Sequence, residues 1–177
     1  YSDVDKQGSL SSNIISTLFF DSKGVLWVST LNGLDKFNAK NESFTNYEIL
    51  TRNPKAPVSY FDKTVYSIFE CSNGNLWLGT LSGLVKFDRL TQSYKLFPHH
   101  YDVFRYGWGS IMQIVEDHSK KLWLATPGEL MRFDARSNTY DYFKNDPLNQ
   151  NSISYNSISS LYLDNTGILW IGTAGIG

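Results

Sequence analysis

A segment centred on tryptophan recurs along the chain. Four of the five tryptophans lie 50, 46 and 47 residues apart, and each sits in nearly the same ten-residue stretch. The stretches read DSKGVLWVST, CSNGNLWLGT, DHSKKLWLAT and DNTGILWIGT, around Trp27, Trp77, Trp123 and Trp170. A repeat of this length predicts an array of one small structural unit, not a single irregular domain.

The four units align without a gap from well before each tryptophan to well after it. Apolar residues recur twelve and nine positions before the tryptophan, and aromatic residues recur after it. In the first unit four short apolar runs, IISTLFF, VLWVST, GLDKF and SFTNY, are separated by turn clusters. Four strands in about 45 residues are typical of a propeller blade. A β-sandwich is the alternative, but it does not predict a gap-free register between units.

The turn before each tryptophan has its own pattern. Glycine lies three positions before the tryptophan in three units, where a tight turn can require a positive φ. Aspartate lies three positions earlier in three units, and its side chain can accept bonds from the turn amides. Cys71 replaces this aspartate in the second unit, and we interpret it as a turn substitute, not as a nucleophile. Lys120 replaces the glycine in the third unit, which predicts a looser hairpin there.

The repeat predicts an all-β fold, a partial β-propeller of four-stranded antiparallel blades. The complete blades are predicted at about 9–47, 60–97 and 106–143, with a partial blade at 152–177. Tyr1 is placed at the end of a preceding blade, so the segment holds about three and a half blades. Closed propellers have typically about 4–8 blades. We therefore expect a segment of a longer propeller, or a dimer that covers the open flanks.

Composition excludes several classes of function. The 177 residues have a net charge of −1, and Lys and Arg form no cluster, which argues against nucleic acid as a partner. No apolar run is long enough to span a membrane. Cys71 is the only cysteine, so the segment has no internal disulfide. No set of residues has metal-binding spacing, and we expect neither a metal nor another cofactor.

Two motifs together carry a family resemblance. The first reads DSKGVLWVSTLNGLDKFN in unit one and CSNGNLWLGTLSGLVKFD in unit two, and the second is the blade-linking DPLNQNSISYNSI. They resemble the two-component regulator propeller repeat, and the resemblance covers essentially the whole chain. It implies a periplasmic sensor region of an inner-membrane hybrid two-component protein, built from paired seven-bladed propellers. It also implies a homodimeric parent, an oligosaccharide ligand and a histidine kinase in parts absent from this segment. The segment itself would have no catalytic residues and no direct membrane contact.

The candidate binding residues lie in the connections between blades. These connections span 48–62, 98–108 and 144–155, and they carry all the length variation between units. Variable loops on a rigid scaffold are the usual place for binding. Aromatic faces can pack on a sugar ring while polar groups bond its hydroxyls. The candidates are Tyr60, Phe61, Asp62, His99, His100, Tyr101, Arg105 and Trp108. The alternative is that these aromatics seal the blade junctions.

Two other functions compete with the sensor. One is a propeller glycosidase or lyase, although Glu116 and Asp117 end a strand at a turn and are not a credible carboxylate pair. The other is a scaffold for dimerisation and signal relay that binds no small molecule. The position ten before each tryptophan is polar and predicts either a hydrogen-bonding channel lining or an ordinary hydrated channel. Its residues are Thr17, Ser67, Gln113 and Ser160.

Overall fold

A computed structural model describes residues 2, 6–51, 60–99 and 109–175. Within them the chain forms three four-stranded sheets and one two-stranded sheet, and every pair of neighbouring strands is antiparallel. The one helical element in these residues is a short 3₁₀ helix, η1 (Tyr60–Lys63). No helix in the described ranges is long and apolar enough to cross a membrane. The predicted all-β architecture is confirmed.

Each sheet is a meander in which every strand pairs with the next one along the chain. Blade 1 consists of β1 (Ile15–Phe20), β2 (Leu26–Thr30), β3 (Gly33–Asn38) and β4 (Ser43–Tyr47). Blade 2 consists of β5 (Ser67–Glu70), β6 (Leu76–Gly79), β7 (Gly83–Phe87) and β8 (Tyr94–Pro98). Blade 3 consists of β9 (Gln113–Glu116), β10 (Leu122–Ala125), β11 (Leu130–Asp134) and β12 (Thr139–Phe143). Blade 4 has β13 (Ile158–Leu163) and β14 (Leu169–Thr173).

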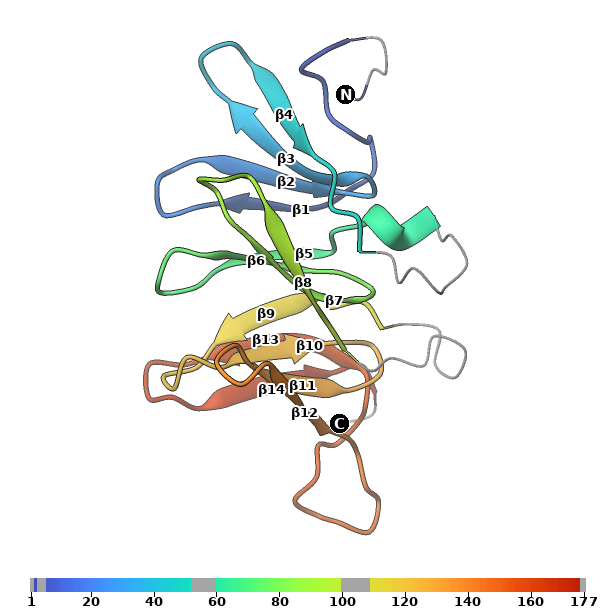
Figure 1. The fold of residues 1–177 in the computed structure, drawn as a ribbon. Helices are drawn as coiled ribbons and strands as arrows, with labels where there is room; N and C mark the ends of the chain where they lie inside the picture. The colour runs from blue at the N-terminus through green and yellow to red at the C-terminus, as the bar shows by residue number, and fades with distance from the viewer. Residues whose placement is uncertain (1, 3–5, 52–59, 100–108, 176–177) are drawn as a thin grey trace.

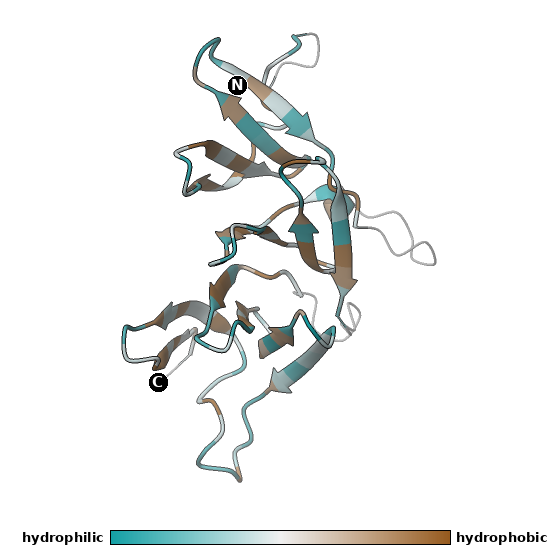
Figure 2. Cartoon of the chain, turned by 60° about the vertical axis from the view of Figure 1, so that its left-hand side comes forward, coloured by the Kyte–Doolittle hydropathy of each residue, from teal (hydrophilic) through white to brown (hydrophobic). Residues whose placement is uncertain are grey.

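The four sheets follow one another in chain order along an arc, from blue to red in Figure 1. The first strands of successive blades lie next to each other, β1 beside β5, β5 beside β9 and β9 beside β13. Figure 2 shows the same arc from another side, with hydrophobic colour concentrated on the strands and hydrophilic colour at many of the turns. Sheets that lie side by side at their first strands and spread outward from there are propeller blades. The chain is a partial β-propeller of about three and a half blades.

Strand pairing repeats in the register that the sequence predicts. The residue eight positions before the tryptophan is its cross-strand partner in every blade, as in Phe19↔Trp27 and Phe69↔Trp77. On the other side of the tryptophan strand, the partner is a basic residue in the three complete blades. The Arg132 guanidinium lies 5.3 Å from the Trp123 ring centroid, within the range of a cation–π interaction.

The turn between the first and second strands is held by its aspartate. Asp21 Oδ1 accepts hydrogen bonds from the amides of Lys23 and Val25 at 3.0 and 2.9 Å, as the sequence predicts. Its Oδ2 accepts a further bond from the Trp27 indole Nε1 at 2.9 Å, which sequence reasoning did not foresee. The same indole bond forms in blades 3 and 4, at 2.9 and 2.8 Å. One carboxylate therefore fixes both the turn and the orientation of the repeated tryptophan.

The expectation of a looser hairpin in blade 3 is wrong. Lys120 adopts a φ of 66°, close to the 74° of Gly24. The amide of Lys120 donates to the Asp117 carbonyl at 2.9 Å, and the amide of Gly24 donates to the Asp21 carbonyl at the same distance. The hydrogen bonds of the turn therefore hold a lysine in a backbone conformation that favours glycine.

The hydrophobic core lies between the blades. Trp27 of blade 1 packs edge-on against Phe87 of blade 2, with ring centroids 5.7 Å apart. Trp77 of blade 2 packs in the same way against Phe133 of blade 3, at 5.8 Å. These side chains lie at the centres of two buried clusters, each shared by adjacent blades. Each blade is thus stabilised mainly by its neighbours.

The two outer faces of the array are apolar and exposed. Phe20 on blade 1 is 68 % exposed, and Trp170 on blade 4 is 59 % exposed. The equivalent Trp27 is only 2 % exposed, because blade 2 covers it. Exposed apolar surface of this kind is typical of a contact surface.

Polar residues on the inner strands tie the blades together. Ser67 Oγ donates to the Ile111 carbonyl at 2.8 Å, from blade 2 to the residues that lead into β9. Gln113 bonds both backbone groups of Leu161, with its Nε2 donating at 2.8 Å and its Oε1 accepting at 2.7 Å. At these two positions the side chains predicted to line a channel instead connect neighbouring inner strands.

Candidate ligand-binding rim

The connections between blades meet the turns between second and third strands at one rim of the molecule. We call this the connection rim. Thr64 follows η1, and its Oγ1 donates to the Leu31 carbonyl in the β2–β3 turn at 3.3 Å. The His99 amide follows β8 and donates to the Ser82 carbonyl in the β6–β7 turn at 3.3 Å. These contacts place the described ends of two connections beside the turns between second and third strands. Figure 1 shows η1 on the right, opposite the turns between first and second strands.

η1 is fixed by backbone contacts from both sides. The amide and the hydroxyl of Thr51 both donate to the Asp62 carbonyl at 2.9 Å. The amide of Thr64 donates to the Phe61 carbonyl at 3.1 Å. An ion pair of 2.7 Å between the partly exposed Lys63 and Glu48 side chains lies beside this segment. These contacts hold the backbone that carries Phe61 and Asp62 in place.

The structure describes some of the predicted site residues and not others. Phe61 is 45 % exposed on the rim, beside the half-buried Asp62. Tyr60 begins η1, and its side chain is not described. His100, Tyr101, Arg105 and Trp108 lie outside the described residues.

His99 is placed at the next blade junction. Its half-buried imidazole lies 6.2 Å from the ring centroid of Tyr140, which belongs to blade 3. The Tyr140 hydroxyl donates to the Phe97 carbonyl at 2.6 Å. Burial raises the pKa of Tyr140 well above its usual range, so it stays a neutral donor. This environment fits the alternative in which an aromatic residue seals a junction.

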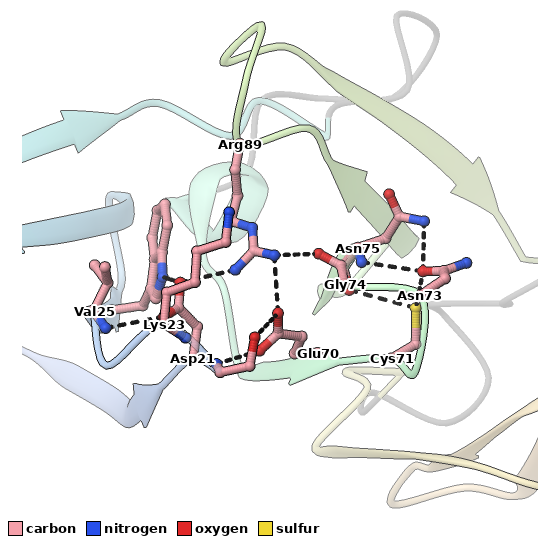
Figure 3. Close-up of polar contacts among 11 residues, drawn as sticks. Asp21, Lys23, Val25, Glu70, Cys71, Asn73, Gly74, Asn75 and Arg89 are labelled. Atoms are coloured by element: carbon pink, nitrogen blue, oxygen red, sulfur yellow. Dashed lines mark hydrogen bonds and ion pairs between the residues drawn. The ribbon is translucent and has the colours of Figure 1, made fainter.

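The opposite rim carries the turns between first and second strands, and we call it the turn rim. Figure 3 shows its polar network at the junction of blades 1 and 2. The Arg89 guanidinium donates to Asp21 Oδ2 and Glu70 Oε1, both at 2.8 Å, and to the Gly74 carbonyl. Glu70 also accepts bonds from the amide and the hydroxyl of Ser22, at 2.6 and 2.9 Å. Arg89 thus connects the turns of two blades.

The carboxylates of this network are held ionised. Burial alone would raise the pKa of Asp21, but bonds from the Trp27 indole, two turn amides and Arg89 outweigh it and hold the pKa below its usual range. The pKa of Glu70 is likewise lowered by Ser22 and Arg89 against the effect of burial. Carboxylates whose pKa values are lowered and whose oxygens already accept several hydrogen bonds do not suit general acid–base catalysis near neutral pH.

Sequence reasoning missed the glutamates of the turn rim, although a signal was present. Glutamate lies seven positions before the tryptophan in blades 2 and 3, and serine lies five before it in blades 1 and 2. The structure pairs them across each junction: Glu70 with the Ser22 amide, and Glu116 with the Ser72 amide at 2.8 Å. Glu116 is thereby committed to a structural contact.

No group of three or more His, Cys, Asp or Glu side chains within the described ranges could hold a metal ion.

The family model of the two-component regulator propeller matches residues 9–32 and 152–175. These segments contain the first and fourth tryptophan repeats, so the resemblance seen in the sequence is confirmed there. The curated proteins contain no match to the chain.

Among solved structures, the chain is similar to the extracellular domain of BT4673 from B. thetaiotaomicron, described both as a one-component and as a hybrid two-component system. The TM-scores are 0.79 and 0.78 at 20 % identity, over 97 % of this chain and 22 % of that domain. The extracellular domain of the hybrid two-component system BT3049 from the same organism gives 0.53 at 22 % identity, over 98 % of this chain and 27 % of that domain. The Dos1 propeller gives 0.58 at 14 % identity, over 90 % of this chain and 42 % of that one.

These likenesses establish a shared fold. The chain spans about a fifth of the length of the BT4673 domain.

Proposed function

We propose that this segment belongs to an extracytoplasmic sensor region that binds an oligosaccharide on the connection rim. The match of two of its repeats to the two-component regulator propeller carries the proposal. The fold shared with extracellular domains of such systems supports it. In this proposal the parent protein is a periplasmic-facing, homodimeric inner-membrane protein. Further blades cover the exposed faces, and a histidine kinase elsewhere in the parent receives the signal.

The rim supplies the chemistry that a sugar requires. Phe61 offers an exposed aromatic face, and a sugar ring packs on such a face through its C–H groups. Asp62 follows directly and can accept bonds from hydroxyl groups. Because Thr51 and Thr64 fix the backbone on both sides, little further ordering is needed when a ligand binds.

A thermal-shift screen tests the proposal. A ligand that binds only the folded state stabilises it, by about 2.7 kcal/mol at a hundredfold excess over Kd. We expect a mixture of oligosaccharides to raise the Tm of the wild type. Phe61→Ala and Asp62→Asn should abolish that rise. Leu90→Ala serves as a control, because Leu90 is 89 % exposed in the turn between β7 and β8, and its loss should leave the rise intact.

Other outcomes favour the competing functions. Absence of any shift with every glycan would favour a relay scaffold that binds no small molecule. Chemical turnover of the oligosaccharides by the protein would favour a glycosidase or lyase. A shift that survives in Phe61→Ala would move the binding site away from η1.

A further inference from the structure

The junction of blades 2 and 3 contains a cavity of about 230 Å³ on the turn rim. Cys71 and Trp77 of blade 2 line it, together with Glu116, Lys120, Ala135 and Arg136 of blade 3. The volume is about eight times the roughly 30 Å³ that one water molecule occupies in the liquid. It is smaller than a pocket for a drug-sized ligand, at about 300–1,000 Å³, so it suits a small molecule.

The junction of blades 1 and 2 has an ion pair that the junction of blades 2 and 3 lacks. There the Arg89 guanidinium bonds the Asp21 carboxylate at 2.8 Å. By the register of the repeat, Ala135 takes the place of Arg89, twelve positions after the tryptophan. Cys71 takes the place of Asp21, six positions before it. Both members of the ion pair are replaced at the same junction, and the cavity opens beside the two replacements.

The replacement leaves the Trp77 indole without an acceptor among the described residues. In blades 1, 3 and 4 the tryptophan Nε1 donates to the turn carboxylate at 2.8–2.9 Å. The Cys71 thiol instead donates to Asn73 Oδ1 at 2.8 Å, and no described residue accepts a hydrogen bond from the Trp77 Nε1. Trp77 is only 4 % exposed. Because Trp77 also lines the cavity, a ligand bound there can supply the missing acceptor.

The charges around the cavity favour an anion. Lys120 Nζ lies 3.0 Å from Ser72 Oγ, and Arg136 also lines the cavity. Glu116 is the one carboxylate in the lining, and its Oε2 already accepts the Ser72 amide at 2.8 Å. The lining therefore contains two cations and one indole N–H without an acceptor. Its single carboxylate already accepts a hydrogen bond from the Ser72 amide.

We infer that this cavity binds a small carboxylate anion. One carboxylate oxygen of the ligand accepts the hydrogen bond of the Trp77 indole, in the place where the other blades have an aspartate. Lys120 and Arg136 provide the opposite charge. The site lies on the turn rim, away from the connection rim, and it is independent of oligosaccharide binding.

An NMR titration tests this site with acetate as the probe. The indole N–H resonance of Trp77, assigned from a Trp77→Phe variant, should shift saturably as acetate is added at constant ionic strength. Chloride at the same concentration should not shift it. An equal response to chloride would contradict the carboxylate specificity, and no saturable response to acetate would overturn the site.

Two variants connect the response to the cavity. The double variant Cys71→Asp/Ala135→Arg rebuilds the ion pair of the first junction, so the indole gains an internal acceptor and acetate should no longer move its resonance. Lys120→Gly restores the residue of the other turns and removes one charge, so it should weaken acetate binding by about tenfold or more. A response unchanged in both variants would overturn the proposal, and the dispersion of the other indole signals shows that each variant is folded.

Discussion

At the scale of single residues, the repeat is organised around one carboxylate. The turn aspartate accepts hydrogen bonds from two backbone amides and from the indole of its own repeat. Asp117, for example, accepts bonds from the amides of Ser119 and Lys121 and from the indole of Trp123. A carboxylate can accept all three bonds because it has several lone pairs and no hydrogen. Asparagine has the same shape, but it would turn an N–H₂ group toward the indole N–H.

Asp117→Asn should therefore destabilise the protein by about 1–3 kcal/mol, the cost of a lost charge-assisted bond and an unpaired donor. Urea unfolding measures the difference. Asp146→Asn is the matched control, because exposed Asp146 uses only Oδ1 to accept the Leu148 amide. Its stability should change by less than about 0.5 kcal/mol. Equal effects of the two substitutions would refute a special role for the indole bond.

At the scale of elements, the blades are joined by specific polar contacts as well as by apolar packing. Arg89 is 16 % exposed, and it holds Asp21 and Glu70, whose side chains are 1 % and 9 % exposed. Removing the cation leaves two buried carboxylates without their counter-charge, which is far more costly than losing a surface pair.

Arg89→Met should lower the free energy of unfolding by about 3 kcal/mol. Lys63→Met removes an ion pair whose side chains are 44 % and 59 % exposed, and it should cost less than about 1 kcal/mol. Chemical denaturation of the two variants compares them directly. A cost as small for Arg89→Met as for Lys63→Met would show that the junction does not depend on this guanidinium.

The same network predicts an acid dependence of stability. The pKa values of Asp21 and Glu70 lie below their ordinary values of 3.8 and 4.5 in the folded protein. The unfolded chain therefore binds protons first, so this contribution is complete above about pH 5 and is lost as the pH falls through the folded values. In Arg89→Met the pKa values are less depressed, and the loss between pH 5 and pH 3 should be smaller than in the wild type. An identical pH profile for both proteins would contradict this linkage.

The sequence predicts elements better than it predicts contacts between them. The tryptophan spacing was enough to place the strands, because a gap-free repeat requires the same pairing in every unit. It could not identify Arg89, because that side chain acts on Asp21 of the preceding blade, 68 positions earlier. It also could not place His99 against Tyr140, because the blade that receives a connecting loop is set by the three-dimensional arrangement.

At the scale of the whole molecule, stability depends on how the blades contact one another. The buried clusters are shared by adjacent blades, and the outer faces are left apolar and exposed. A repeat array of this kind is stabilised by nearest-neighbour interfaces. Ligand binding on the connection rim would act on those same interfaces, since η1 and His99 both lie at blade junctions.

Trp27 and Trp77 each pack on a phenylalanine of the next blade, and a double-mutant cycle at the first junction measures this radial packing most directly. Trp27→Leu and Phe87→Leu should show a coupling free energy of about 0.5–1.5 kcal/mol, because their rings are 5.7 Å apart across the junction. Trp27 and Phe37 lie in the same blade, but Phe37 packs on Phe44 instead. The stability effects of Trp27→Leu and Phe37→Leu should therefore be additive. Coupling within the blade and additivity across the junction would contradict the radial arrangement of repeats.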